Sequence, residues 1–180
     1  MDQTSEALAT KINELVESIR KTTSFWSNHN GWAPEATANI LSRAQLNWIS
    51  SLSVSLHNWN RCLSNGDLIL AWANIGAIVE GYLKFFLVVY DHDYRKRPHL
   101  RKGDYVSQDV IRLEDLRVYF KKNVWADTDN WDDWISDIQT KRNAIHAFKE
   151  RDIGDTRQLH DQIFRLHEFV RDIDSRLPYP

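Results

Sequence analysis

Residues 68–90, LILAWANIGAIVEGYLKFFLVVY, are a long apolar stretch that decides the fold class of this chain. Its length and the apolar residues all around its helical surface predict a helix buried at the centre of a fold. The stretch could also span a bilayer of about 30 Å. Glu80 and Lys84 argue against a membrane, because charges are costly at membrane depth, whereas in a bundle they can pair or face a groove. We therefore expect a core helix and no membrane contact.

Small residues recur along this stretch and permit close approach of another helix, from the same chain or from a second copy. They are Ala71, Ala73, Gly76, Ala77 and Gly81.

The flanking segments repeat apolar residues at helical spacing, and no proline interrupts any of them. Ser64 to Asp67 resembles a tight turn with Asp67 as the N-cap of the central helix, and Asp155 or Thr156 is expected to cap the last helix. The sequence predicts an all-α, up-down bundle of five to six helices, in which 34–63 and 67–90 are two long antiparallel central helices. The other expected helices cover about 6–21, 111–125, 130–149 and 156–176.

Two stretches without helical periodicity separate these segments. The first, SFWSNHNGW at 24–32, is expected to be a connector whose Phe25, Trp26 and Trp32 pack onto the bundle. The second, 91–109, is expected to be a loop between the third and fourth helices. Its five basic residues suit a phosphate backbone, with a solvated loop as the alternative. They are Arg95, Lys96, Arg97, Arg101 and Lys102.

Composition narrows the class of protein further. A chain of 180 residues with no repeat or composition shift predicts one domain over 1–180. A single cysteine, Cys62, and a charged N-terminal segment unlike a signal peptide predict a cytoplasmic protein. The net charge of −2 gives no overall field for polyanions, so any such binding must be local.

No motif for a phosphate loop, a zinc protease or a redox pair is present, and we expect neither a metal nor another cofactor. Acidic and histidine side chains of the 91–109 loop lack a preset geometry for a metal ion. Those side chains belong to Asp91, His92, Asp93 and His99.

Arg142 and His146 are the sharpest functional signal. Both fall within about 40° of the apolar stripe of the predicted 130–149 helix, at about 100° per residue. Arginine is rarely buried without a partner, so this position indicates a carboxylate partner, a groove or an interface. The candidate carboxylates belong to Glu80, Asp133 and Asp137.

The stretch TKRNAIHAF, residues 140–148, resembles the signature helix of the HEPN superfamily, in which an Arg, often followed by Asn, precedes a His. The order of helices fits the HEPN plan as well. The resemblance implies a homodimer whose cleft cleaves RNA without metal. It assigns phosphate binding and transition-state stabilisation to Arg142, proton transfer to His146 and a supporting contact to Asn143. Only three residues separate the Arg and the His here, a shorter spacing than is usual in the family.

Three interpretations of this pair remain open at the level of sequence. The first is a metal-independent ribonuclease of toxin or defence type, since cleavage by a ribose 2′-OH needs a proton-transfer group and a cation. The second is RNA binding without cleavage. The third is a structural Arg–carboxylate pair in a non-catalytic module that dimerises or binds a protein partner such as an antitoxin.

Overall fold

The computed structural model describes residues 3–28, 33–146 and 148–180. These residues form eight α-helices, three 3-10 turns and one short β-hairpin, so the all-α prediction is confirmed. The elements are α1 (Gln3–Ser27), α2 (Glu35–Arg43), α3 (Leu46–Val54), η1 (Ser55–Trp59), α4 (Asn65–Val89), α5 (Asp91–Lys96), β1 (Leu100–Arg101), β2 (Asp104–Tyr105), η2 (Gln108–Val110), α6 (Leu113–Asn123), α7 (Trp131–Arg142), η3 (Asn143–His146) and α8 (Thr156–Ser175).

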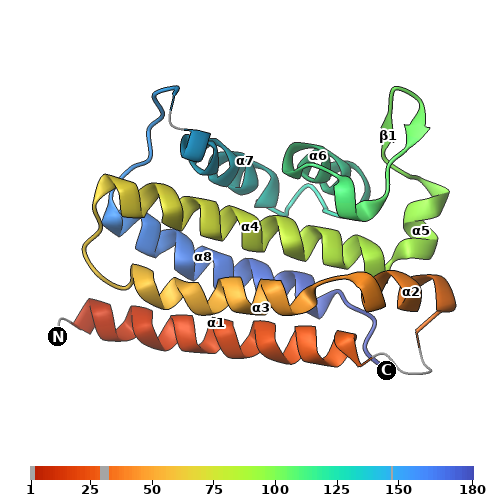
Figure 1. Cartoon of the computed structure of the whole chain (residues 1–180), viewed down its shortest axis with the longest axis horizontal. Helices are drawn as coiled ribbons and strands as arrows, with labels where there is room; N and C mark the ends of the chain where they lie inside the picture. Colours follow the sequence, from red (N-terminus) through yellow and green to blue (C-terminus); the bar gives the residue numbers. More distant parts are fainter. Residues whose placement is uncertain (1–2, 29–32, 147) are drawn as a thin grey trace.

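The helices run alternately up and down along the long axis of the molecule (Figure 1). The long helices α1, α4 and α8 run in one direction, and two pairs of shorter helices, α2 with α3 and α6 with α7, return in the other. α4 lies at the centre and contacts α3, α6, α7 and α8. The expected up-down arrangement is therefore present, with both return segments broken into shorter helices.

α4 is the buried core helix that its composition predicted. Its residues Trp72, Ile75 and Tyr82 have no exposed surface, and buried side chains from α1 to α8 join them in one core cluster. Among the described helices, α4 alone has the length and hydropathy to cross a membrane, and 67% of its most apolar window is buried within the fold. This burial is typical of a core helix.

The start of α4 differs from the prediction. The helix begins at Asn65 with Ser64 as its N-cap, and Asp67 is the third helical residue. The Oγ of Ser64 accepts from the Asp67 amide at 3.3 Å, and the Asp67 carboxylate accepts from the Ser64 amide at 3.2 Å. The expectation of Asp67 as N-cap is wrong. The cap is Ser64, three residues earlier, because the two side chains there satisfy the free amides of both Ser64 and Asp67. Asp155 caps α8 through the same kind of box, as predicted.

The segment expected as one helix over 34–63 is divided. Ala44 has extended backbone, with ψ 136°, and separates α2 from α3 without a proline. The break shifts the inward face, so that Leu46 and Ile49 are buried while Trp48 is 64% exposed. The prediction of two long antiparallel central helices thus holds for α4 but not for its partner.

The segment 91–109 is more ordered than the loop that was expected. It contains α5, the antiparallel β1–β2 hairpin and η2. Buried Asp91 accepts from Arg95 Nε and from Gln108 Nε2, each at 2.7 Å, and the Tyr94 hydroxyl donates to the Val106 carbonyl. These contacts join the two ends of the segment.

The first helix is also longer than expected. α1 continues through Ser27, so the first residues of the predicted connector are helical. Trp26 is buried, as predicted, and its ring meets Phe85 of α4 edge to face. Phe25 is about one-third exposed, and Trp32 lies outside the described residues.

Candidate functional site

Arg142 ends α7 and lies against α4. Its guanidinium donates to Glu80 Oε2 at 2.5 Å, and the other carboxylate oxygen of Glu80 is 2.7 Å from Lys84 Nζ. Of the three carboxylates proposed from sequence, Glu80 is the one that pairs with Arg142. One carboxylate therefore holds two cations, and this cluster of Glu80, Lys84 and Arg142 carries a formal charge of +1.

The cluster is partly shielded from water. The side chains of Glu80, Lys84 and Arg142 are 18%, 25% and 31% exposed. Burial acts to raise the pKa of Glu80, but the hydrogen bonds and charges of Lys84 and then Arg142 outweigh it, so this pKa lies below its ordinary value. Glu80 is thus held as a carboxylate by its two neighbours.

Gly76 explains how Arg142 reaches this carboxylate. A methyl group on Gly76 would lie 2.5 Å from Cδ and 3.1 Å from Cβ of Arg142. The stem of Arg142 therefore crosses α4 at a position that has no side chain, one turn before Glu80. The small residues of this stretch were expected to permit such an approach. Another of them, Gly81, would meet Ile49 of α3 at 3.1 Å.

His146 faces a different direction from Arg142. The regular helix expected over 130–149 ends at Arg142, and residues 143–146 form the 3-10 turn η3. Because a 3-10 turn advances about 120° per residue, against 100° in an α-helix, the two side chains do not stack on one face. Ala144 is the buried residue of the turn. His146 is exposed and makes no hydrogen bond to the part of the chain that the structure describes.

The other predicted site residues near Arg142 have separate surroundings. Asn143 is the C-cap of α7 and is partly buried. Asp137 pairs with Lys141 at 2.7 Å and not with Arg142. Lys141 in turn lies over the ring of Trp72, 4.9 Å from its centroid. Asp133 is exposed on α7.

The Glu80–Lys84–Arg142 cluster lines a groove of about 840 Å³, which we call the α3–α4 groove. Apolar side chains of α2, α3 and α4 form most of its walls. Trp48 and Val110 also line the groove and are 64% and 57% exposed. The apolar lining consists of Ile40, Leu41, Ala44, Leu46, Trp48, Ile49, Leu52, Ala77, Phe85, Val88 and Val110.

The position of Arg142 indicated a groove as one alternative, but the sequence did not predict which residues line it. The partner of Arg142 was among the candidates, but Trp48 and Val110 were not recognised as groove residues. Trp48 has helical spacing with Ala44 and Leu52, and only the break between α2 and α3 turns it outward. No local signal in the sequence marks that break.

The five basic residues of 91–109 are less available than their number suggests. Arg95 pairs with Asp91 at 2.7 Å, Lys96 with Asp93 at 2.9 Å and Arg101 with Asp115 at 3.1 Å. Arg97 and Lys102 make no ion pair with any described residue. The segment therefore offers two unpaired cations.

Asp91 is buried and paired with Arg95, and His99 lies 3.6 Å from Asp115. No group of three or more potential ligands among His, Cys, Asp and Glu occurs in the described part of the chain. The structure thus does not bring Asp91, His92, Asp93 and His99 together.

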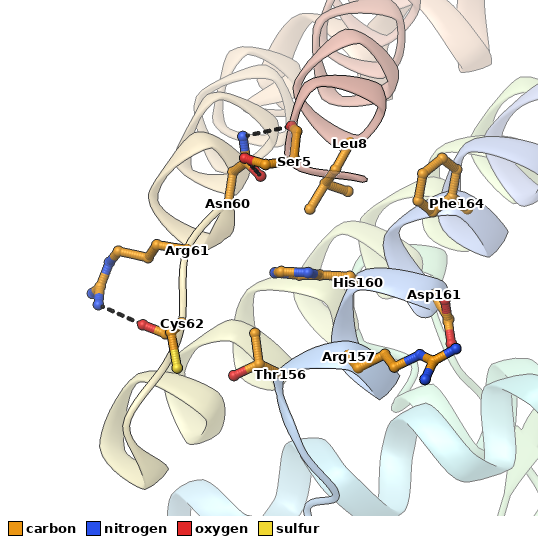
Figure 2. A pocket seen from close by; sticks show the side chains of 10 residues that line it. All are labelled: Ser5, Leu8, Asn60, Arg61, Cys62, Thr156, Arg157, His160, Asp161 and Phe164. Atoms are coloured by element: carbon orange, nitrogen blue, oxygen red, sulfur yellow. Dashed lines mark hydrogen bonds between the residues drawn. The ribbon is translucent and has the colours of Figure 1, made fainter. Parts of the chain in front are cut away.

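A second hollow, of about 660 Å³, lies where the starts of α1 and α8 meet residues 60–62 (Figure 2). Several of its polar side chains are used in internal contacts. His160 Nε2 is 2.8 Å from the Trp59 carbonyl, Asn60 binds Ser5, and Arg61 donates to the Cys62 carbonyl at 3.3 Å. Cys62 is an exposed free thiol. The contacts of His160 and Asn60 join residues 59–60 to the starts of α8 and α1.

Comparisons of the whole chain with protein-family models, with curated proteins and with solved structures yield no match.

Proposed function

We propose that this protein is a HEPN-like ribonuclease whose site combines Arg142 and His146 from two copies of the chain. The observation that carries the proposal is that an arginine held at a groove is followed, four residues later, by an exposed histidine. Arg142 is held by Glu80, whereas His146 makes no hydrogen bond within the described residues. The first is a positioned cation, and the second is a proton carrier open to a substrate.

The chemistry follows from these two groups. The ribose 2′-OH attacks the adjacent phosphorus, its proton passes to an imidazole, and the bond from phosphorus to the 5′ oxygen breaks. The products are a 2′,3′-cyclic phosphate and a 5′-hydroxyl, whose oxygen takes a proton from a second imidazole. Imidazole suits both transfers because it exchanges protons near neutral pH. A guanidinium stabilises the negative charge that builds up on the phosphate oxygens.

A second copy supplies what one chain lacks. Within one chain Arg142 points to α4 and His146 points outward, so one copy does not hold both groups around a phosphate. Ile145 and Phe148, on either side of His146 in the sequence, are exposed apolar residues. Exposed apolar groups around polar ones favour an interface, and a two-fold axis there brings two histidines and two arginines together.

RNA cleavage in EDTA tests this proposal. We expect the wild type to cleave a mixed single-stranded RNA and His146→Ala to lose at least about a hundredfold in rate, the usual size of an acid–base contribution. His57→Ala is the matched control, since His57 is exposed on η1 and far in sequence from the site. Both variants should keep the wild-type melting temperature. Equal cleavage by all three proteins, or none by the wild type, would contradict the ribonuclease proposal.

A second function is favoured by the α3–α4 groove. Its walls are mainly apolar and Trp48 lines it while largely exposed, which is typical of a site for a protein partner. In this alternative the bundle is a non-catalytic module that binds a partner protein, such as an antitoxin. A wild type that never cleaves RNA, together with a partner whose binding is lost in Trp48→Ala, would support it.

A further inference from the structure

A further pocket, bordered in part by residues 91–109, which we call the hairpin segment, contains a different set of groups. It has a volume of about 530 Å³ and lies between the end of α4, α5, α6 and the end of α8. None of its lining residues belongs to the α3–α4 groove. It is therefore a separate site, and what it binds does not depend on whether Arg142 and His146 cleave RNA.

Aromatic rings make up much of its wall. Phe86 and Tyr90 lie with ring centroids 4.7 Å apart, and Tyr94 and Tyr119 lie 5.4 Å apart. Phe86 and Tyr94 are buried, whereas Tyr90 and Tyr119 keep part of their rings open. The pocket thus presents tyrosine faces on which a planar group can stack.

One cation of the pocket has no carboxylate partner among the described residues. Lys96 pairs with Asp93, and Arg176 pairs with Asp129 and Asp172, both at 3.0 Å. Arg97 lines the pocket and makes no ion pair with the described residues. Tyr119 lines the same pocket. Burial raises the pKa of Tyr119, and the charge of Arg97 opposes this rise.

Hydrogen-bonding groups also line this pocket. The hydroxyl of Tyr90 donates to the Arg176 carbonyl, and that of Tyr94 donates to the Val106 carbonyl. The Tyr119 hydroxyl makes no hydrogen bond to any described residue. Asn123 uses its amide nitrogen on the Tyr119 carbonyl and leaves its oxygen available as an acceptor.

We infer that this pocket binds a nucleotide, with the base on the Tyr119 ring, the phosphate on Arg97 and the polar edge of the base near Asn123. A ring face, a single unpaired guanidinium and a nearby amide oxygen match an aromatic ligand that carries one anionic group. A duplex backbone fits less well, because it needs a row of free cations and the pocket offers one. The nucleotide is either free or one unit of a single strand.

Calorimetric titration with AMP, adenosine and a short single-stranded oligoadenylate tests this inference. We expect AMP to bind and Arg97→Gln to weaken it about tenfold, the usual loss when a charged hydrogen bond to phosphate is removed. Adenosine should bind more weakly than AMP and with the same affinity in both proteins. Lys102→Gln is the matched control, since it removes an unpaired cation of the same segment that does not line the pocket. It should leave AMP binding within about twofold.

Two further variants test the ring. Tyr119→Phe keeps the stacking surface and should weaken AMP by less than about threefold, whereas Tyr119→Leu removes it and should weaken AMP at least about fivefold. If Tyr119→Leu does not fold, Arg97→Gln and Tyr119→Phe still decide the matter. Tighter binding of the oligomer than of AMP, with the same loss in Arg97→Gln, identifies a strand as the source, and equal affinities identify free nucleotide.

The inference is overturned if the wild type binds neither AMP nor the oligomer saturably at millimolar concentration, or if Arg97→Gln is no weaker than Lys102→Gln. Neither outcome touches the ribonuclease proposal, since cleavage is measured separately and depends on His146. Conversely, a wild type that never cleaves RNA leaves this pocket unaffected.

Discussion

Two cationic regions of this molecule are built in different ways. In the hairpin segment, Arg95 pairs with Asp91 and Lys96 with Asp93, over three or four residues and with both cations more than half exposed. At the groove, Arg142 pairs with Glu80 across 62 positions of sequence, on another helix and with most of both side chains covered. The two pairs of the hairpin segment join residues one turn apart in α5, so they need only that helix to form. The groove pair requires the packing of α7 on α4 and so reports on the tertiary fold.

The crossing of α7 over α4 at Gly76 should be the most sensitive point in this comparison. We expect Gly76→Leu to lower the free energy of unfolding by about 3 kcal/mol, because its side chain must displace the stem of Arg142. Gly66→Leu is the control, since a Cβ there meets nothing closer than 3.9 Å. Urea denaturation measures both. A loss at Gly66 as large as at Gly76 would show that the crossing does not set the effect, because leucine has a higher helix propensity than glycine at both positions.

Removing one carboxylate from the groove cluster and one from a pair of the hairpin segment compares how much the two kinds of pair stabilise the fold. Glu80→Gln should cost about 1–2 kcal/mol of unfolding free energy, since it leaves two shielded cations without a counter-charge. Asp93→Asn, which breaks an exposed pair, should cost less than about 0.5 kcal/mol. Chemical denaturation at low and high salt gives both values. Equal costs for the two variants would mean that the groove cluster is no stronger than a surface pair.

The effect of Glu80→Gln should also depend on pH. The pKa of Glu80 is lowered in the fold, so its stabilising contribution is present above the ordinary value of 4.5 and is lost as the pH falls through the folded value. The difference in unfolding free energy between wild type and Glu80→Gln should therefore shrink between pH 6 and the acid limit of folding, by up to about 1 kcal/mol. A difference that stays constant on acidification would show that the carboxylate charge contributes nothing.

Trp48 should give the smallest change in stability. Because its side chain is 64% exposed, Trp48→Ala should alter the free energy of unfolding by less than about 0.5 kcal/mol in dilute protein. The matched core variant, Trp72→Ala, should lose at least about 3 kcal/mol. Thermal melts at several protein concentrations measure both. A large loss for Trp48→Ala that grows with concentration would instead show that this side chain is covered in an oligomer.

Much of the helical order could be predicted from periodicity. The apolar runs placed α1, α4, α6, α7 and α8 to within a few residues, apart from the ends of α1 and α7. The division of 34–63 was missed because no proline or glycine lies at Ala44 and Gln45, and both halves keep helical spacing. The hairpin segment was missed because its order comes from contacts between its two ends, such as the pair between Asp91 and Gln108.

Some features of the candidate site could also be predicted from the sequence, and others could not. An arginine on an apolar stripe predicted a carboxylate partner, and Glu80 was among the three candidates. The direction of His146 could not be predicted, because the change from α-helix to 3-10 turn after Arg142 has no signature in Asn143 or Ala144. The α3–α4 groove likewise depends on residues from five elements, α2, α3, α4, η2 and α7, whose relative positions no local pattern encodes.

The sequence by itself determined the helical class, the buried central helix and the existence of a partner for Arg142. Each follows from side-chain periodicity or from the cost of leaving a charge unpaired, which are properties of one segment. Only the tertiary structure decided which carboxylate Arg142 meets, which cations of the hairpin segment remain free, and where the groove and the pockets open. Those depend on distances between segments far apart in the chain, and such distances are set by the packing of the whole bundle.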